Sequence, residues 1–112
     1  MSGLSNLEYH VLLALAKGQL HGYAIKEVVA AESAGTLEPR AGSLYRVLAR
    51  LMGAGLVAEV PAEGELTPHP GLTRRYYALT DAGRRALGAE AERLRGAAAL
   101  AEDRLRLARS PS

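Results

Sequence analysis

The sequence predicts a mainly α-helical protein with one small β-hairpin and a long C-terminal helix. Three stretches before residue 54 repeat their apolar residues at helical spacing, which is typical of short amphipathic helices. Two runs of β-branched and aromatic residues then flank a stretch rich in proline and glycine, as in a hairpin with a long tip. From residue 81 onward, leucine and alanine recur in a heptad pattern that indicates one long helix.

Composition narrows the classes of protein to which the chain can belong. Its 112 residues, 48% hydrophobic and 23% charged, are typical of one small globular unit. It contains no cysteine, which excludes disulfides, thiolate metal sites and cysteine nucleophiles and favours a cytoplasmic location. Its apolar runs are far shorter than the roughly 20 residues that a membrane span needs, so we expect no membrane partner.

The first two helices are predicted from their caps and their periodicity. Ser5 and Glu8 match a capping box, and apolar residues repeat at helical spacing over about 6–17, before Gly18 interrupts them. A second helical repeat follows a short turn and ends near Gly35, a residue suited to a C-cap. We therefore expect two short helices joined by a tight turn.

A third helix is predicted over residues 42–53, and its two faces differ. Apolar residues form the stripe expected to be buried: Leu44, Val47, Leu48 and Leu51. Polar and aromatic residues form the opposite face: Ser43, Tyr45, Arg46 and Arg50. Arg40 precedes the helix, and the whole segment 39–58 contains no acidic residue. Because arginine binds phosphates and guanine edges bidentately, this face is typical of a surface that contacts nucleic acid.

Two strands are predicted on either side of a loop. Residues 56–60 are apolar and β-branched, residues 73–79 alternate, and 61–71 between them holds three prolines and two glycines. Alternation sends Arg74 and Arg75 in different directions, so only one of them needs to face a bound polyanion. Acidic residues lie in the first half of the hairpin: Glu59, Glu63 and Glu65. We therefore expect its tip to lie away from such a partner or to be mobile.

A long final helix is predicted over residues 81–109, with Thr80 as its N-cap. Leucine and alanine alternate spacings of four and three along it and make a heptad seam: Leu87, Ala91, Leu94, Ala98, Ala101, Leu105 and Ala108. At 1.5 Å per residue this helix is about 40 Å long, more than a three-helix head can cover. We therefore expect a dimerisation helix that packs on a second copy, following a head of residues 1–80 and preceding a frayed end at 110–112.

The order of three helices followed by a hairpin is that of a winged helix-turn-helix, a DNA-binding module. In such a module the recognition helix, here 42–53, enters the major groove, and the wing, here 56–79, lies along the backbone. The residues expected to contact double-stranded DNA are Arg40, Ser43, Tyr45, Arg46, Arg50, Arg74 and Arg75. As a homodimer, the protein would bind a two-fold symmetric operator.

Other interpretations fit part of the same pattern. Arg46 and Arg50, taken alone, could be solvated residues on a helix surface. Winged helices also serve as protein-interaction modules without sequence-specific DNA binding, and a third alternative is a ligand sensor in which DNA binding is secondary.

Neither catalysis nor metal binding is expected. His10, His21 and His69 lack ligand-like spacing, and His21 with Gly22 is expected to shape the turn into the second helix. Ser43 has no histidine beside it, and no pattern for a phosphate loop or a cofactor is present. We therefore expect a protein that is not an enzyme and carries no cofactor and no metal.

Four segments match, in order, those of a known family: HGYAI at 21–25, GSLYRVLARL at 42–51, GLV at 55–57 and RRYYALTDAGRRAL at 74–87. With them the sequence resembles the PadR-like bacterial transcriptional regulators over nearly its whole length. Three positions depart from the family: Ala41 stands where proline is frequent, Ser43 where threonine is commoner, and Met52 where glutamate is frequent. The last change removes an ion pair that such a glutamate would form.

The resemblance implies a winged-helix head and a homodimer formed through the C-terminal helix, as in the shorter subfamily with a single such helix. It also implies repression of nearby genes by operator binding, with release by a small apolar or aromatic effector. Some relatives stack flat effectors on tryptophan, whereas this chain has neither tryptophan nor phenylalanine. An effector would then lie against Tyr9 or in gaps beside the alanines of the seam, and its identity stays unknown.

Overall fold

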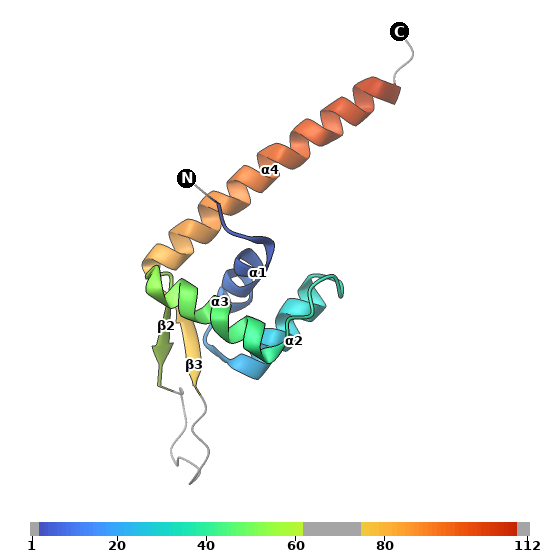
Figure 1. Ribbon diagram of the computed structural model, residues 1–112. Coiled ribbons are helices and arrows are strands. Elements are labelled where there is room, and N and C mark those ends of the chain that lie inside the picture. Colours follow the sequence, from blue (N-terminus) through green and yellow to red (C-terminus); the bar gives the residue numbers. More distant parts are fainter. Residues whose placement is uncertain (1–2, 62–74, 110–112) are drawn as a thin grey trace.

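The computed structural model describes residues 3–61 and 75–109. A head built from three helices and a small sheet carries one long helix that extends away from it (Figure 1). The elements follow in the order α1 (Asn6–Leu15), β1 (Leu20–His21), α2 (Gly22–Glu32), α3 (Ala41–Gly53), β2 (Val57–Val60), β3 (Tyr76–Leu79) and α4 (Asp81–Arg109). The predicted fold class, mainly helical with a small β element and a long final helix, is confirmed.

The core of the head lies where α1, α2 and α3 meet. Each helix contributes fully buried aliphatic residues, among them Leu12 from α1, Ile25 from α2 and Leu48 from α3. The capping box begins α1 as predicted: the Ser5 hydroxyl accepts from the Glu8 N–H at 3.1 Å, and the Ser5 N–H donates to Glu8 Oε1 at 2.8 Å. The buried contacts among the three helices hold α3 against α1 and α2 with its polar face outward.

The sheet has three strands in the order β1, β3, β2, all antiparallel. The predicted two-stranded hairpin is therefore incomplete, because Leu20 and His21 pair with Tyr77 and Tyr76 of β3. A strand of two residues is too short to show alternation, so the sequence pattern does not reveal it. The added strand ties the turn before α2 directly to the wing.

The start of α4 is fastened to the end of α3. The Thr80 hydroxyl donates to the Gly55 carbonyl at 2.6 Å and accepts from the Gly83 N–H at 3.0 Å, as its predicted role of N-cap requires. Gly83 lies so close to β2 that a Cβ there would come within 2.0 Å of the Leu56 carbonyl oxygen. This close approach fixes the direction in which α4 leaves the head.

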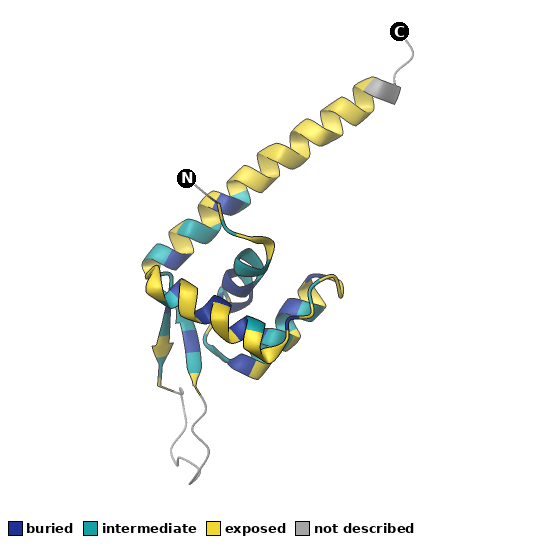
Figure 2. Cartoon of the chain, viewed as in Figure 1, coloured by how far each residue is buried: buried dark blue, intermediate teal, exposed yellow. Residues whose placement is uncertain are grey.

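Only the first turns of α4 are covered by the head. Ala86 and Leu87 pack against its core and Glu90 is buried, whereas residues 92–107 are all exposed (Figure 2). Within the described residues, no helix combines the length and apolar character that crossing a membrane requires.

Candidate nucleic-acid interface

The outward face of α3, formed by Ser43, Tyr45, Arg46 and Arg50, lies opposite the buried stripe as the sequence predicts. Three of its four residues are exposed, and Ser43 is half-buried. No hydrogen bond from a side chain caps the start of α3, whose N-cap is the exposed Arg40. The face is therefore a row of polar side chains that are open to solvent.

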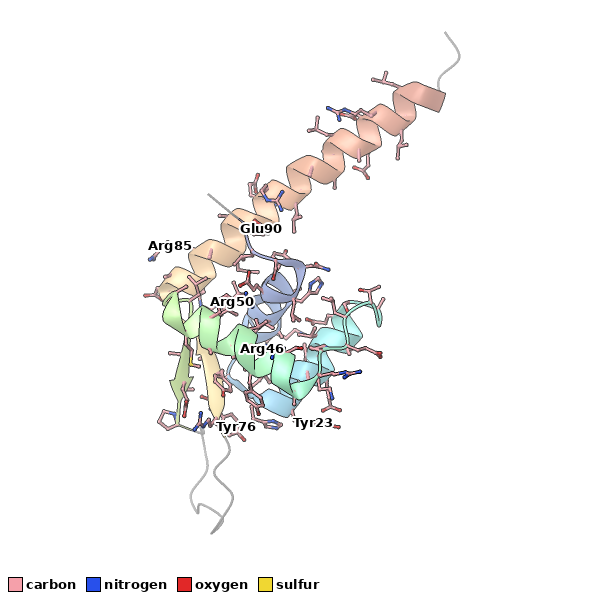
Figure 3. The ribbon with its side chains drawn as sticks, viewed as in Figure 1. Tyr23, Arg46, Arg50, Tyr76, Arg85 and Glu90 are labelled. Carbon is pink, nitrogen blue, oxygen red and sulfur yellow. The ribbon has the colours of Figure 1, made fainter. Side chains whose placement is uncertain are left out.

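Arg46 is the cation on this face that has no acidic partner among the described residues. Its Nη2 donates to Ser43 Oγ at 3.5 Å, a long hydrogen bond to a side chain on the same helix. Figure 3 shows Arg46 midway along α3. A guanidinium held this loosely can turn toward a phosphate or a base edge at little cost.

Arg50 is paired with an acidic residue of another helix, since its own segment, 39–58, contains none. Its Nε lies 3.3 Å from Oε2 of Glu8, whose side chain is only 14% exposed while that of Arg50 is 64% exposed. The same glutamate closes the capping box of α1. Arg50 thus fastens α3 to α1, and any contact with DNA would have to be made by a guanidinium that is already held.

Tyr45 packs on the first residue of α2. A Cβ at Gly22 would come within 2.6 Å of the Tyr45 hydroxyl oxygen, so only glycine allows this approach. Tyr45 remains half-exposed. Tyr77 lies buried nearby. Burial raises the pKa of its hydroxyl, and the negative charge of an ionised Tyr45 would raise this pKa further. The position of Tyr45 is therefore set by packing against Gly22, and the rest of its side chain faces solvent.

His21 joins α2 to the wing. Its Nδ1 accepts from the Ala24 N–H at 3.2 Å, which caps α2, and its ring meets Tyr76 edge to face at 5.6 Å between centroids. The expectation that His21 shapes this turn is confirmed, although the strand pairing with Tyr76 was missed. Among the described residues, no group of histidine and carboxylate side chains could hold a metal ion.

The sequence pattern did not single out a groove of about 330 Å³ beside the start of α3. It runs between α2 and the connection to α3 and is lined by Tyr23, Lys26, Glu27, Ala30, Glu38, Pro39 and Arg40. Tyr23, on α2, is 64% exposed. The spacing of 23, 26, 27 and 30, which share one face of a helix, was the signal that could have revealed this stripe.

The wing is described only at its base. Arg75 Nε lies 4.0 Å from Glu59 Oε2, so the cation of the returning strand faces the acid of the outgoing strand. Arg74 and the predicted tip, with Glu63, Glu65 and His69, lie outside the described residues.

The predicted dimerisation residues divide into two groups. Leu87 packs on the core of its own chain and Ala91 is half-buried, so the head already covers this end of the seam. Leu94, Ala98, Ala101 and Leu105 are exposed, and Leu105 is 63% exposed. The side chain of Ala108 lies outside the described part. Two further leucines, Leu100 and Leu107, are also exposed on this helix.

The boundary between the two groups is marked by an ion pair. Arg93 donates to the buried Glu90 carboxylate with Nε 3.1 Å from Oε1, and this hydrogen bond lowers the pKa of Glu90. Glu90 also lies against the N-terminal segment, since a Cβ on Gly3 would come within 3.2 Å of Oε1. Glu90 is thus the last buried position of α4 among the side chains described, which end at 107.

Comparison with known proteins identifies one matching family and several solved structures with the same fold. Residues 11–89 match the transcriptional regulator PadR-like family. A protein of Streptomyces fradiae, named only as an uncharacterized 37.1 kDa protein in transposon TN4556, is 43% identical over 81 residues, or 72% of this chain. The chain spans about a fifth of the length of that relative, since the match covers 21% of it.

Solved structures share the fold. A PadR family transcription regulator from Clostridium difficile R20291 superposes with a TM-score of 0.73 at 20% identity, covering 90% of this chain and 99% of that one. Bacillus subtilis PadR, solved in complex with operator DNA, superposes with a TM-score of 0.64 at 26% identity, covering 75% of this chain and 46% of that one.

Proposed function

The chain belongs to the PadR-like family of transcriptional regulators, and from that premise we propose that it binds a two-fold symmetric operator as a homodimer and represses transcription. Proteins of this family regulate transcription and are not enzymes. The observation that carries the proposal is the outward face of α3, where Arg46 is exposed and has no acidic partner among the described residues. The likeness to a PadR solved with operator DNA supports the same role for this face.

In this proposal, Arg46 reaches base edges in the major groove, and Ser43 and Tyr45 bond to the phosphates that border it. Arg50 contacts the backbone while Glu8 holds its Nε, so its main effect is to fix the tilt of α3. Arg75, or Arg74 outside the described residues, reaches the backbone from the wing.

The groove beside α3 extends the proposed interface. Lys26 and Arg40 line it, and no ion pair involves either residue within 3–61 and 75–109. Tyr23 adds an exposed hydroxyl. A DNA backbone that follows the start of α3 would place a phosphate near these two cations and one donor. Glu27 and Glu38 line the same groove, so these contacts would position the backbone and add no net positive charge.

The exposed part of the seam is the proposed dimer interface. Leu94, Ala98, Ala101 and Leu105 would be covered by the same residues of a second copy. Small side chains at two of these positions leave room for an apolar or aromatic effector, whose binding would change the spacing of the heads and release the operator. The proposed location is the cytoplasm.

The test is fluorescence anisotropy of the purified protein with duplexes from its own upstream region and with scrambled duplexes, at several salt concentrations. We expect a preference for one upstream duplex and a steep loss of affinity with salt, because each phosphate contact releases counterions. Equal, weak binding to all duplexes at every salt concentration would contradict the proposal and favour a protein-interaction module.

A further inference from the structure

The exposed part of α4 carries charged residues beside its apolar seam. Arg95 follows Leu94, and Glu102 follows Ala101, at the flanking heptad positions that meet a partner helix. Among the residues that the structure describes, Arg95 pairs only within its own helix, with Nη1 3.1 Å from Glu92 Oε2 and both side chains largely in solvent. Glu102 forms no ion pair in the part of the chain that the structure describes.

We propose that a second copy packs on α4 antiparallel and in one register, in which Ala98 lies opposite Ala101 of the partner subunit. This inference rests on the proposed function, which requires a homodimer. In this register each Leu94 packs on the partner's Leu105, so both exposed leucines of the seam are covered. The alanine layers at the centre allow the two backbones to approach closely. Each Arg95 then lies beside the partner's Glu102 at both ends of the interface.

Charge excludes the neighbouring antiparallel registers. A shift by one heptad in one direction brings Arg95 opposite the partner's Arg95. A shift in the other direction brings Glu102 opposite the partner's Glu102. Like charges at facing positions destabilise a helix pair and are a common way to select one register.

Charge also disfavours a parallel pair. There, Arg95 would face the partner's Glu90, which is buried and already accepts from Arg93 at 3.1 Å. Glu102 would face the partner's Ala97 and stay without a counter-ion. Two heads at the same end of the pair would also compete for space around the first turns of α4, which each head covers (Figure 2).

The register sets the distance between the heads. With Ala98 opposite the partner's Ala101, the two Leu87 residues are about 37 Å apart along the helix pair, at 1.5 Å per residue. Successive major grooves on one face of B-DNA are about 34–36 Å apart. Because the start of α4 is fixed to the end of α3 through Thr80 and Gly55, this register also sets how far apart the two recognition helices lie.

Reversing charges tests the register without DNA, so its outcome is independent of operator binding. We expect Arg95→Glu and Glu102→Arg each to weaken the dimer on the order of tenfold, because each creates two like-charged contacts. The double variant, and an equimolar mixture of the two single variants, should restore dimerisation, and the loss of affinity in the single variants should fade at high salt.

Arg106→Glu, which changes a charge paired with Asp103 on the same helix, is the matched control. Sedimentation equilibrium measures the dissociation constants. Unchanged dimerisation in Glu102→Arg, or no rescue by the double variant, would overturn the register.

Cysteine cross-linking gives an independent check, since the parent chain has no cysteine. Neither Leu94→Cys nor Leu105→Cys should cross-link with itself, because each pair of equal positions is about 16 Å apart along the axis. The mixture of the two variants should form a disulfide-linked dimer. A cross-linked dimer of Leu94→Cys alone, or a monomeric protein at all concentrations, would contradict the proposal.

Discussion

The head and the exposed part of α4 use the same apolar periodicity with opposite results. In the head, the aliphatic residues of α1, α2 and α3 meet in one core within the chain, and Leu12 and Leu48 are fully buried. On α4, the seam begins with Leu87 against the head and continues outward to Leu105, which is 63% exposed. A periodic pattern therefore indicates that a face is apolar, but it does not say which element covers it.

The ion pairs of the two regions differ in the same way. In the head, Arg50 and Glu8 join two helices that are distant in sequence. On the exposed part of α4, Arg95 pairs with Glu92, and Arg106 with Asp103, three positions away on the same helix. Pairs of the second kind are worth only a few tenths of a kcal/mol, about 0.3–0.5. Pairs this weak leave the charges of α4 available to a partner.

The same substitution should have different effects in the two regions, and this is the largest difference we expect. Leu48→Ala removes a fully buried side chain and should lower the free energy of unfolding by about 2–5 kcal/mol. Leu105→Ala should change the unfolding of the single chain by less than about 0.5 kcal/mol, yet weaken the dimer. Denaturation at low protein concentration and sedimentation measure the two effects. Equal losses of chain stability would contradict the contrast.

The joint between the two regions can be tested at Gly83. An alanine there would place its Cβ within 2.0 Å of the Leu56 carbonyl oxygen, so α4 must move away from β2. We expect a loss of about 1–3 kcal/mol in thermal or chemical unfolding. Gly88→Ala is the matched control on the same helix, where nothing lies within 4 Å of the added atom, and it should stabilise by up to about 1 kcal/mol. Equal effects of the two variants would mean that the joint is loose.

The pair between α1 and α3 should contribute less. A double-mutant cycle with Glu8→Gln and Arg50→Met should give a coupling energy of about 0.5–1 kcal/mol, because one partner is largely shielded and the other is exposed. The corresponding cycle for Arg95 and Glu92, both exposed, should give a smaller value in the monomer. A coupling near zero for Glu8 and Arg50 would remove its assigned role in fixing α3.

The smallest expected effect is the pH dependence at the boundary between the regions. The hydrogen bond from Arg93 lowers the pKa of Glu90. This contact therefore contributes stability above the unfolded pKa of glutamate, about 4.3, and the contribution is lost as the pH falls through the lower folded value. Glu90→Gln should lose less stability than the parent between about pH 6 and pH 3. Glu92→Gln, at an exposed position, serves as the control. If Glu90→Gln loses as much stability as the parent between about pH 6 and pH 3, the stabilising role of Glu90 is contradicted.

The sequence predicted those elements whose signals are local. The third helix was expected over 42–53 and spans Ala41–Gly53, and the final helix was expected over 81–109 and spans Asp81–Arg109. β1 was missed because two residues carry no periodicity. The partner of Arg50 was missed for another reason: Glu8 belongs to a different helix, and only the packing of α1 on α3 brings the two together.

Only those parts of the candidate interface that lie within one segment were predicted, because contacts between elements leave no local signal in the sequence. The outward face of α3 follows from helical spacing within one segment, whereas the groove at Tyr23 and Lys26 depends on how α2 meets the connection before Arg40. The contact of Tyr45 with Gly22 likewise joins two elements. The roles of these residues toward DNA stay predictions.

The most direct test of the account is operator binding by Arg46→Ala, compared with the parent and with Arg106→Ala on the exposed part of α4. Because Arg46 is exposed and forms no ion pair among the described residues, the variant should keep its circular dichroism spectrum and its unfolding midpoint. We expect Arg46→Ala to bind the preferred duplex at least about tenfold more weakly and to discriminate less between it and scrambled DNA. Arg106→Ala should bind as the parent does. Equal affinity of all three proteins for the preferred duplex would contradict the claim that the outward face of α3 reads DNA.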